Sequence, residues 1–306
     1  DIYHPCGYAD IEGQLAKIKV HNNKQIIFAI NGCDKITHKN TLWSILYNYY
    51  GRDESKKTMP ESFILDSKED LDLFKSKFQP KKMYVIKKNL QRKKGIKLSN
   101  NLDEIMNIDK EFKVVQEFII DTYLINNRVL NLRIYFMIIC KNNEVSFYLH
   151  KLGKCLYSAK DINSDLSDFD SRITNSYKTS LDIYNNNPLT LDELNKYLNK
   201  KKPKSSTVLF NNIQNIFKKL CNAIKHHIKS SPNLLNNITT QLFGVDVIFG
   251  KNMKPYILEL NKGPDMEPKD DKDYNIKYKV ELDMLEKLKL IKVNDIGYSN
   301  DFRTIN

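Results

Sequence analysis

Three oxygen-bearing side chains in the C-terminal third of the chain have the spacing of a metal site. Asp246 lies in an alternating stretch typical of a strand, and Glu259 and Asn261 lie in a second such stretch after the turn-like residues 250–254. Folding back about residue 252 brings Asp246 opposite Glu259 to within about one residue of register. Because side chains at i and i+2 of a strand share a face, Glu259 and Asn261 point the same way.

This set of ligands suits magnesium, which takes one or two carboxylates and leaves its other positions to phosphate oxygens and water. The alternative is a surface hairpin whose acidic residues face water, which is common for a bare Asp and Glu pair. Glu259, however, lies between Leu258 and Leu260 in an otherwise apolar strand, and residues 261–264 end that strand at a turn. The sequence therefore predicts that Asp246, Glu259 and Asn261 hold the Mg²⁺ of a nucleotide.

The composition indicates a folded, basic protein. The 306 residues are 41% hydrophobic and 10% aromatic, and the net charge is +12. Such a charge favours an anionic partner, which could be nucleic acid, a membrane surface, a nucleotide or an acidic protein. The longest apolar stretch, residues 134–140, is too short to cross a bilayer, so we expect no membrane segment. The five cysteines are scattered and odd in number, which favours free thiols, a cytoplasmic location and no zinc site.

Hydrophobic periodicity predicts the elements that must position these groups. We expect helices over 40–50, closed by Gly51, over 69–78 and over 210–228, and strands over 25–31, 83–87, 113–119, 132–140 and 144–150. Residues 52–59 have the composition of a linker. Residues 161–206 are polar and predict only short elements, and the lysine run 200–204 is interpreted as a solvated linker.

Short motifs along nearly the whole chain provide a second line of evidence. In the N-terminal half these are residues 30–42; 59–65, similar to P-E-T-F-I-L; 84–87, similar to W-I-x-K; 94–96, at the end of a phosphate-covering loop; and 115–119, similar to V-Q-K-Y-I. Residues 132–133 match the end of K-F-D-L-R, and residues 173–175 are similar to H-L-T-N. Residues 241–246 and 258–261 are similar to Q-L-F-G-F-D and L-E-V-N. Together they resemble the tubulin-tyrosine ligase family.

The resemblance implies an α+β protein with the ATP-grasp fold. The nucleotide would be held between a central domain and a C-terminal antiparallel α+β domain, beside a small N-terminal α/β domain. The expected boundaries are 1–58, 59–122 and 123–306. The resemblance also implies ATP and Mg²⁺ as cofactors and a ligase that joins a free amino acid to a protein carboxylate through an acyl phosphate. The expected acceptor is acidic, as in tubulin tyrosine ligase-like modification of a tubulin C-terminal tail, and we expect a monomer.

The motifs also assign roles to residues. Lys87 would bind the phosphates. The hinge, residues 116–119, would hydrogen-bond adenine through its backbone, and Arg133 would bind an acyl phosphate or carboxylate. By themselves, a Lys at a strand end is commonly solvated and a lone Arg in an apolar strand is commonly a structural ion-pair member. The expected cofactor-binding residues are Lys87, Lys94, Gln116, Glu117, Phe118, Ile119, Asn131, Thr174 and Asn175, and the expected catalytic residues are Arg133 and Lys154.

Several positions depart from the family pattern. Val129 and Asn131 replace the Lys and Asp of K-F-D-L-R, Leu156 replaces the Arg of a G-x-x-R pattern, and Glu117 replaces the hinge Lys. The loop 89–95 is also poor in glycine.

If the protein is active, other cations must replace the missing charges. We expect Lys154, in a turn, and the loop cations Arg92, Lys93 and Lys94 to do so rather than Arg128, which should face away from the site. The alternative is a catalytically impaired pseudoenzyme that binds tubulin or another acidic partner. Nucleic-acid binding is disfavoured, because aromatic residues are not interleaved with the lysine runs.

Overall fold

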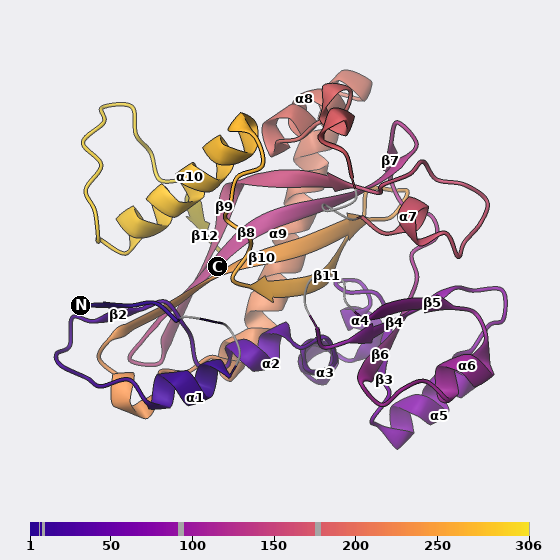
Figure 1. Cartoon of the computed structure of the whole chain (residues 1–306), viewed down its shortest axis with the longest axis horizontal. Coiled ribbons are helices and arrows are strands. Elements are labelled where there is room, and N and C mark those ends of the chain that lie inside the picture. Colours follow the sequence, from indigo (N-terminus) through magenta and orange to yellow (C-terminus); the bar gives the residue numbers. More distant parts are fainter. Residues whose placement is uncertain (6, 8–9, 91–94, 175–178, 306) are drawn as a thin grey trace.

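The computed structural model describes residues 1–5, 7, 10–90, 95–174 and 179–305. It is a mixed α+β structure with two sheets (Figure 1). The large sheet has the order β1-β2-β10-β8-β9-β12, with β11 paired to β10 and β7 to β8, and the small sheet has the order β3-β6-β4-β5. The strands of the large sheet are β1 Ile2–Tyr3, β2 Ile26–Ile27, β7 Leu124–Ile125, β8 Arg128–Lys141, β9 Glu144–Tyr157, β10 Ile238–Phe249, β11 Pro255–Lys262 and β12 Phe302–Thr304.

The other regular elements of the described part of the chain are the strands of the small sheet and the helices. The strands of the small sheet are β3 Ser62–Ile64, β4 Tyr84–Lys88, β5 Ile96–Ser99 and β6 Phe112–Glu117. The α-helices are α1 Ile11–Ala16, α2 Cys33–Thr37, α3 Lys39–Tyr50, α4 Arg52–Ser55, α5 Lys68–Lys77, α6 Leu102–Met106, α7 Phe169–Arg172, α8 Leu191–Lys201, α9 Ser205–Ile224 and α10 Asp271–Lys287. Three short 3-10 helices are η1 Leu181–Asn185, η2 Lys225–His227 and η3 Pro232–Leu234.

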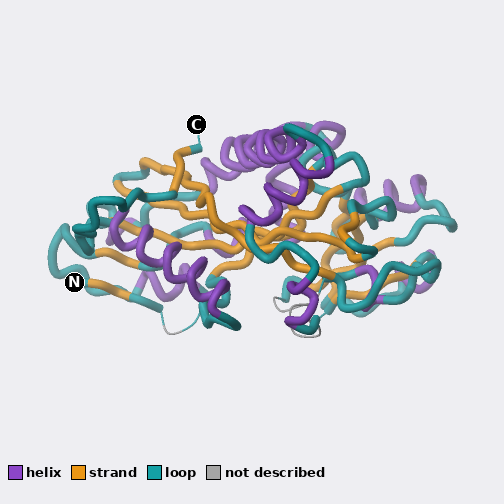
Figure 2. Tube along the Cα trace, turned by 90° about the horizontal axis from the view of Figure 1, so that it is seen from above, coloured by secondary structure: helices purple, strands orange, loops and turns teal. Residues whose placement is uncertain are grey.

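Strand β8 is apolar almost throughout because helices cover both faces of the large sheet. Phe136 points to one face and lies 5.5 Å from Phe217 of α9, measured between ring centroids. Its neighbours Tyr135 and Met137 point to the other face and pack in the cluster that contains Val280 of α10. Figure 2 shows helices on both sides of the central strands. The long apolar run is therefore a strand buried on both sides.

Strands from the segment 1–58, for which we predicted a small N-terminal α/β domain, pair with the large sheet. Strand β2 pairs in parallel with both β1 and β10. Trp43 of α3 and Leu46 belong to the same core as the strands of the large sheet. The strand expected over 25–31 shrinks to Ile26–Ile27, because only these two residues pair with β10.

The small sheet has a core of its own within the span expected for a central domain. Phe63, Phe74 and Tyr84 form an aromatic cluster in which Phe74 lies 5.2 Å from Phe63 and 5.1 Å from Tyr84 between ring centroids. The amphipathic helix α5, predicted from its spacing, supplies Phe74. The two sheets thus have separate cores.

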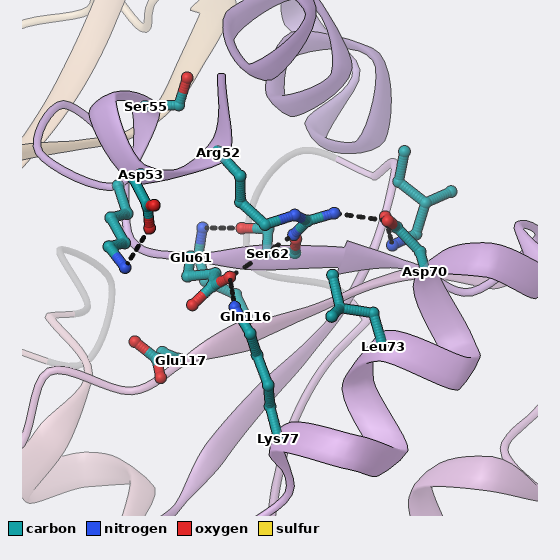
Figure 3. Close-up of polar contacts among 12 residues, drawn as sticks. Arg52, Asp53, Ser55, Glu61, Ser62, Asp70, Leu73, Lys77, Gln116 and Glu117 are labelled. Carbon is teal, nitrogen blue, oxygen red and sulfur yellow. Dashed lines mark hydrogen bonds and ion pairs between the residues drawn. The ribbon is translucent and has the colours of Figure 1, made fainter. Parts of the chain in front are cut away.

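Arg52 joins the small sheet to the N-terminal helices, in a segment that we expected to be a linker. Residues 52–55 form α4, and the Arg52 guanidinium donates to the Ser62 carbonyl at 2.8 Å and pairs with Asp70 (Figure 3). Its guanidinium carbon also lies 5.5 Å from the ring centroid of Trp43 and 5.1 Å from that of Phe63. The contacts of Arg52 fix the position of β3 against α3 and α4.

The polar region 161–206 is more ordered than its composition suggests. It contains the 11-residue helix α8, which begins with a capping box formed by Thr190 and Glu193. Lys200 and Lys201 belong to this helix, so the linker interpretation of the lysine run was wrong for these two residues. Helix α9 begins at Ser205, before the residue expected. No helix in the described part of the chain is long and apolar enough to span a membrane.

Candidate functional site

A cavity of about 670 Å³, including its solvent-open part, lies between the small sheet and the large sheet. Most of the residues that the sequence singled out line its wall: Lys87, Gln116, Glu117, Phe118, Ile119, Asn131, Thr174, Asp246 and Glu259. The other residues of the wall are Pro60, Val85, Ile96, Arg172, Ile173, Ile248 and Leu258. The topology thus brings together side chains from β4, β6, β8, β10 and β11.

The hairpin of β10 and β11 has the register that the sequence predicts, with Asp246 paired directly to Glu259. The amide nitrogen of Asn261 lies 3.2 Å from a Glu259 oxygen and 3.5 Å from an Asp246 oxygen. The three side chains therefore converge at one point. Two carboxylates and an amide oxygen fit the small number of protein ligands that Mg²⁺ takes. Among the described residues, no group of three or more His, Cys, Asp or Glu forms an alternative metal centre.

Arg133 holds one of these carboxylates from the neighbouring strand β8. Its Nε donates to Asp246 Oδ1 at 2.7 Å and its Nη2 to Asp246 Oδ2 at 3.2 Å, a bidentate pair. Burial alone would lower the pKa of Arg133, but the Asp246 carboxylate outweighs burial and raises it. Gly244 makes room for this side chain, because a Cβ there would lie 2.8 Å from Arg133 Cδ. Arg133 thus contacts a candidate metal ligand.

Sequence reasoning missed Lys39, which pairs with the other carboxylate. Lys39 is 4% exposed, and its ammonium lies 3.1 Å from Glu259 Oε2 and donates to the Leu90 carbonyl at 2.9 Å. Burial would raise the pKa of Glu259, but the charges of Lys39 and Lys87 lower it to about 2. The motif 30–42 suggested this helix, but its local pattern could not identify a partner on β11.

Lys87 projects from β4 into the cavity. Its ammonium donates to Gln116 Oε1 at 2.6 Å, and the Gln116 amide donates to Ser62 Oγ at 2.8 Å. Burial lowers the pKa of Lys87 to about 8, although the nearby Glu259 carboxylate partly opposes this effect. Gln116 therefore orients a buried cation whose environment disfavours its charge.

The hinge leaves one backbone donor available. The amide of Glu117 donates to the Glu61 carbonyl at 2.8 Å, and that of Phe118 to the Met83 carbonyl at 3.3 Å. The amide of Ile119 makes no hydrogen bond with the described part of the chain. Ile119 is thus the hinge amide that a ligand can engage.

Asn131 and Thr174 form the wall beside the hairpin. The Asn131 amide donates to Thr174 Oγ1 at 2.9 Å, while Asn131 Oδ1 is buried and has no hydrogen-bond partner among the described residues. An unpaired buried acceptor in a cavity wall fits a ligand that donates, such as a hydroxyl group or metal-bound water. The expected residues Lys94 and Asn175 lie outside the described residues.

The expectation that Lys154 lies in a turn was wrong. Lys154 is on β9, opposite Arg133 in the register, and does not line the cavity. Its ammonium lies 3.1 Å from Asp273 Oδ1, so α10 already supplies its counter-ion. Arg128 pairs with Asp161 and donates to the Ser158 carbonyl, and it does not line the cavity either. Both cations thus have partners away from the cavity, and the loop cations Arg92, Lys93 and Lys94 of the same prediction lie outside the described residues.

Comparisons with known proteins agree with the motifs. A sequence model described as the tubulin-tyrosine ligase family matches residues 17–295. The chain is similar to the probable tubulin polyglutamylase TTLL9 of Rattus norvegicus, with 27% identity over 181 residues that cover 57% of this chain and 38% of the relative. The probable tubulin polyglutamylase ttll-9 of Caenorhabditis elegans is 26% identical over 195 residues, which cover 61% of this chain and 45% of the relative.

A further relative carries a name that denotes lost activity. The inactive polyglycylase TTLL10 of Homo sapiens is 22% identical over 233 residues, which cover 67% of this chain and 34% of the relative. In each of these three comparisons the matched region covers less than half the length of the relative.

Proposed function

The chain belongs to the tubulin-tyrosine ligase family, and from this premise we propose that it is an ATP-dependent ligase. It joins an amino acid to a carboxylate of an acidic protein acceptor, and a tubulin tail is the candidate acceptor. The net charge of +12 is compatible with such a partner. The mixed α+β architecture with two sheets is compatible with the family's ATP-grasp-like fold.

One observation carries the proposal: two carboxylates and an amide converge on the hairpin while Lys87 faces them from the other sheet. Asp246 and Glu259 line the same cavity as Lys87. In the proposed complex, Asp246, Glu259 and Asn261 hold Mg²⁺ and Lys87 contacts a phosphate oxygen. The backbone at Ile119 binds the adenine edge.

The proposed reaction needs positive charge, because two anions must approach each other. Bound Mg-ATP supplies a phosphoryl group, which the acceptor carboxylate oxygen takes as ADP leaves. The amine of the donor then attacks the activated carbonyl, phosphate leaves and the amine loses a proton. Lys87 stabilises the negative charge on the transferred group, and Arg133 fixes the orientation of Asp246.

The test is incorporation of labelled amino acid into tubulin. We expect the protein with Mg-ATP to add one of glutamate, glycine or tyrosine to tubulin, and we expect the Glu259→Gln variant to add none. Modified tail peptides identified by mass spectrometry would name the amino acid. If the unaltered protein, like the variant, labels tubulin with none of these amino acids, the ligase proposal is wrong.

A second candidate function is a binding protein that keeps the fold without turnover. The observation that favours it is the apolar character of Val129, 1% exposed, and Leu156, 8% exposed, where the family pattern has cations. Such a protein would bind Mg-ATP and an acidic partner but would not label tubulin. If the unaltered protein is inactive and the double variant Val129→Lys, Leu156→Arg gains ligase activity, this alternative is established.

A further inference from the structure

Arg172 is a buried cation in the cavity wall that the motifs did not single out. It ends the short helix α7 and lies directly before Ile173 and Thr174, at the position where H-L-T-N has its His. The side chain is 6% exposed and lines the cavity together with Asp246 and Glu259.

Arg172 has few partners for a buried guanidinium. Its Nη2 donates to the Asn163 carbonyl, and its Nε is buried and has no hydrogen-bond partner among the residues that the structure describes. No ion pair joins it to an acidic residue of the described chain. The nearest acidic residues in sequence have other contacts: Asp168 accepts from the Asn163 amide, and Asp170 pairs with Lys160.

A buried charge without a counter-ion is costly, so such groups are paired or bind ligands. The guanidinium carries five N–H donors in a planar fork that matches phosphate oxygens. The orphaned Arg172 Nε is a donor, and the orphaned Asn131 Oδ1 in the same wall is an acceptor. A ligand that satisfies both carries oxyanions and hydroxyl groups, as a nucleotide does.

We propose that Arg172 binds a phosphate oxygen of the nucleotide and supplies positive charge that Val129 and Leu156 do not. This inference rests on the proposed function and extends it to a residue that no motif assigns. It also removes the need for Lys154 or Arg128, whose cations already have partners elsewhere.

The experiment compares Arg172→Ala with Arg128→Ala, which removes an arginine outside the cavity. Calorimetry measures binding of Mg-ATP and of adenosine, which lacks phosphate, to each variant and to the unaltered protein. We expect Arg172→Ala to weaken Mg-ATP binding by about 10- to 100-fold, the effect of one hydrogen bond to a charged group, and to change adenosine binding by less than about twofold. Arg128→Ala should change neither ligand.

The Arg172→Lys variant keeps the charge without the fork, so we expect an intermediate loss for Mg-ATP. If Arg172→Ala does not fold, the same two binding measurements are made with Arg172→Lys. Equal Mg-ATP affinity in the unaltered protein and the variants would overturn the assignment of Arg172 alone. Equal losses for Mg-ATP and adenosine would show a purely structural role and overturn it too. An unaltered protein that binds neither ligand would instead overturn the proposed function, and this inference with it.

Discussion

Replacing Lys87 by Met should separate the function of this residue from its effect on stability. Lys87 is 7% exposed, and burial lowers the pKa of its ammonium from 10.5 to about 8. The folded protein therefore binds the Lys87 proton less tightly than the unfolded chain does. Between these two pKa values the unfolded chain holds more protons, so the contribution of Lys87 to stability rises with pH.

The size of the effect follows from the shift. A shift of roughly 2.5 units at about 1.4 kcal/mol each corresponds to a penalty of about 3.5 kcal/mol at pH 7. The penalty falls to about 1.5 kcal/mol at pH 9.5, because Lys87 of the folded protein is then almost entirely neutral while most of the unfolded chain still holds the proton. Lys87→Met has no ammonium and does not carry this penalty. Its stability relative to the unaltered protein should thus increase by roughly 2 kcal/mol as pH falls from 9.5 to 7.

Equilibrium urea unfolding at several pH values measures this difference. Lys82→Met is the control, because Lys82 projects from the same region and its side chain is 45% exposed. We expect no comparable pH dependence for the control. The Met variant should also lose Mg-ATP affinity although its relative stability at pH 7 improves. A stability difference that does not change with pH would refute the argument that Lys87 is charged at a cost in the folded protein.

Further variants test the other contacts of the site and of the fold. Glu259→Gln should weaken ATP binding in the presence of Mg²⁺ and leave ATP binding without Mg²⁺ nearly unchanged; equal affinities by calorimetry at physiological magnesium would reject the metal assignment. Arg133→Ala should lower the free energy of unfolding by about 3–5 kcal/mol, because it leaves Asp246 buried and unpaired; an unchanged urea midpoint would argue against that pair. Arg52→Ala should cost about 3 kcal/mol for the same reason, whereas the exposed Arg303→Ala should cost less than about 0.5 kcal/mol.

The hairpin could be predicted because its information is local. Alternation, a turn and the spacing of Asp246, Glu259 and Asn261 together specify one register, and the structure has that register. The helix predicted over 40–50 and its end at Gly51 are local in the same sense, and the structure has α3 over Lys39–Tyr50. Patterns of this kind depend on neighbours within a few residues.

The remaining features depend on contacts between distant segments. Nothing near Lys39 in the sequence identifies Glu259 as its partner, and nothing near Lys154 identifies Asp273. The residues 52–55 have the composition of a linker, and only their packing shows that Arg52 is a structural centre. Arg172 was missed because it departs from the His of H-L-T-N, and a single arginine in a polar region carries no periodic signal.

In the proposed function, the cavity couples nucleotide cleavage to amino-acid ligation. The most direct measurement quantifies ADP formed and amino acid incorporated in one reaction with tubulin and Mg²⁺. We predict equal amounts of the two products, repeated turnover of ATP to ADP that requires both acceptor and amino acid, and loss of both products in Glu259→Gln. Binding of Mg-ATP and tubulin without either product would contradict the claim and leave a binding protein in its place.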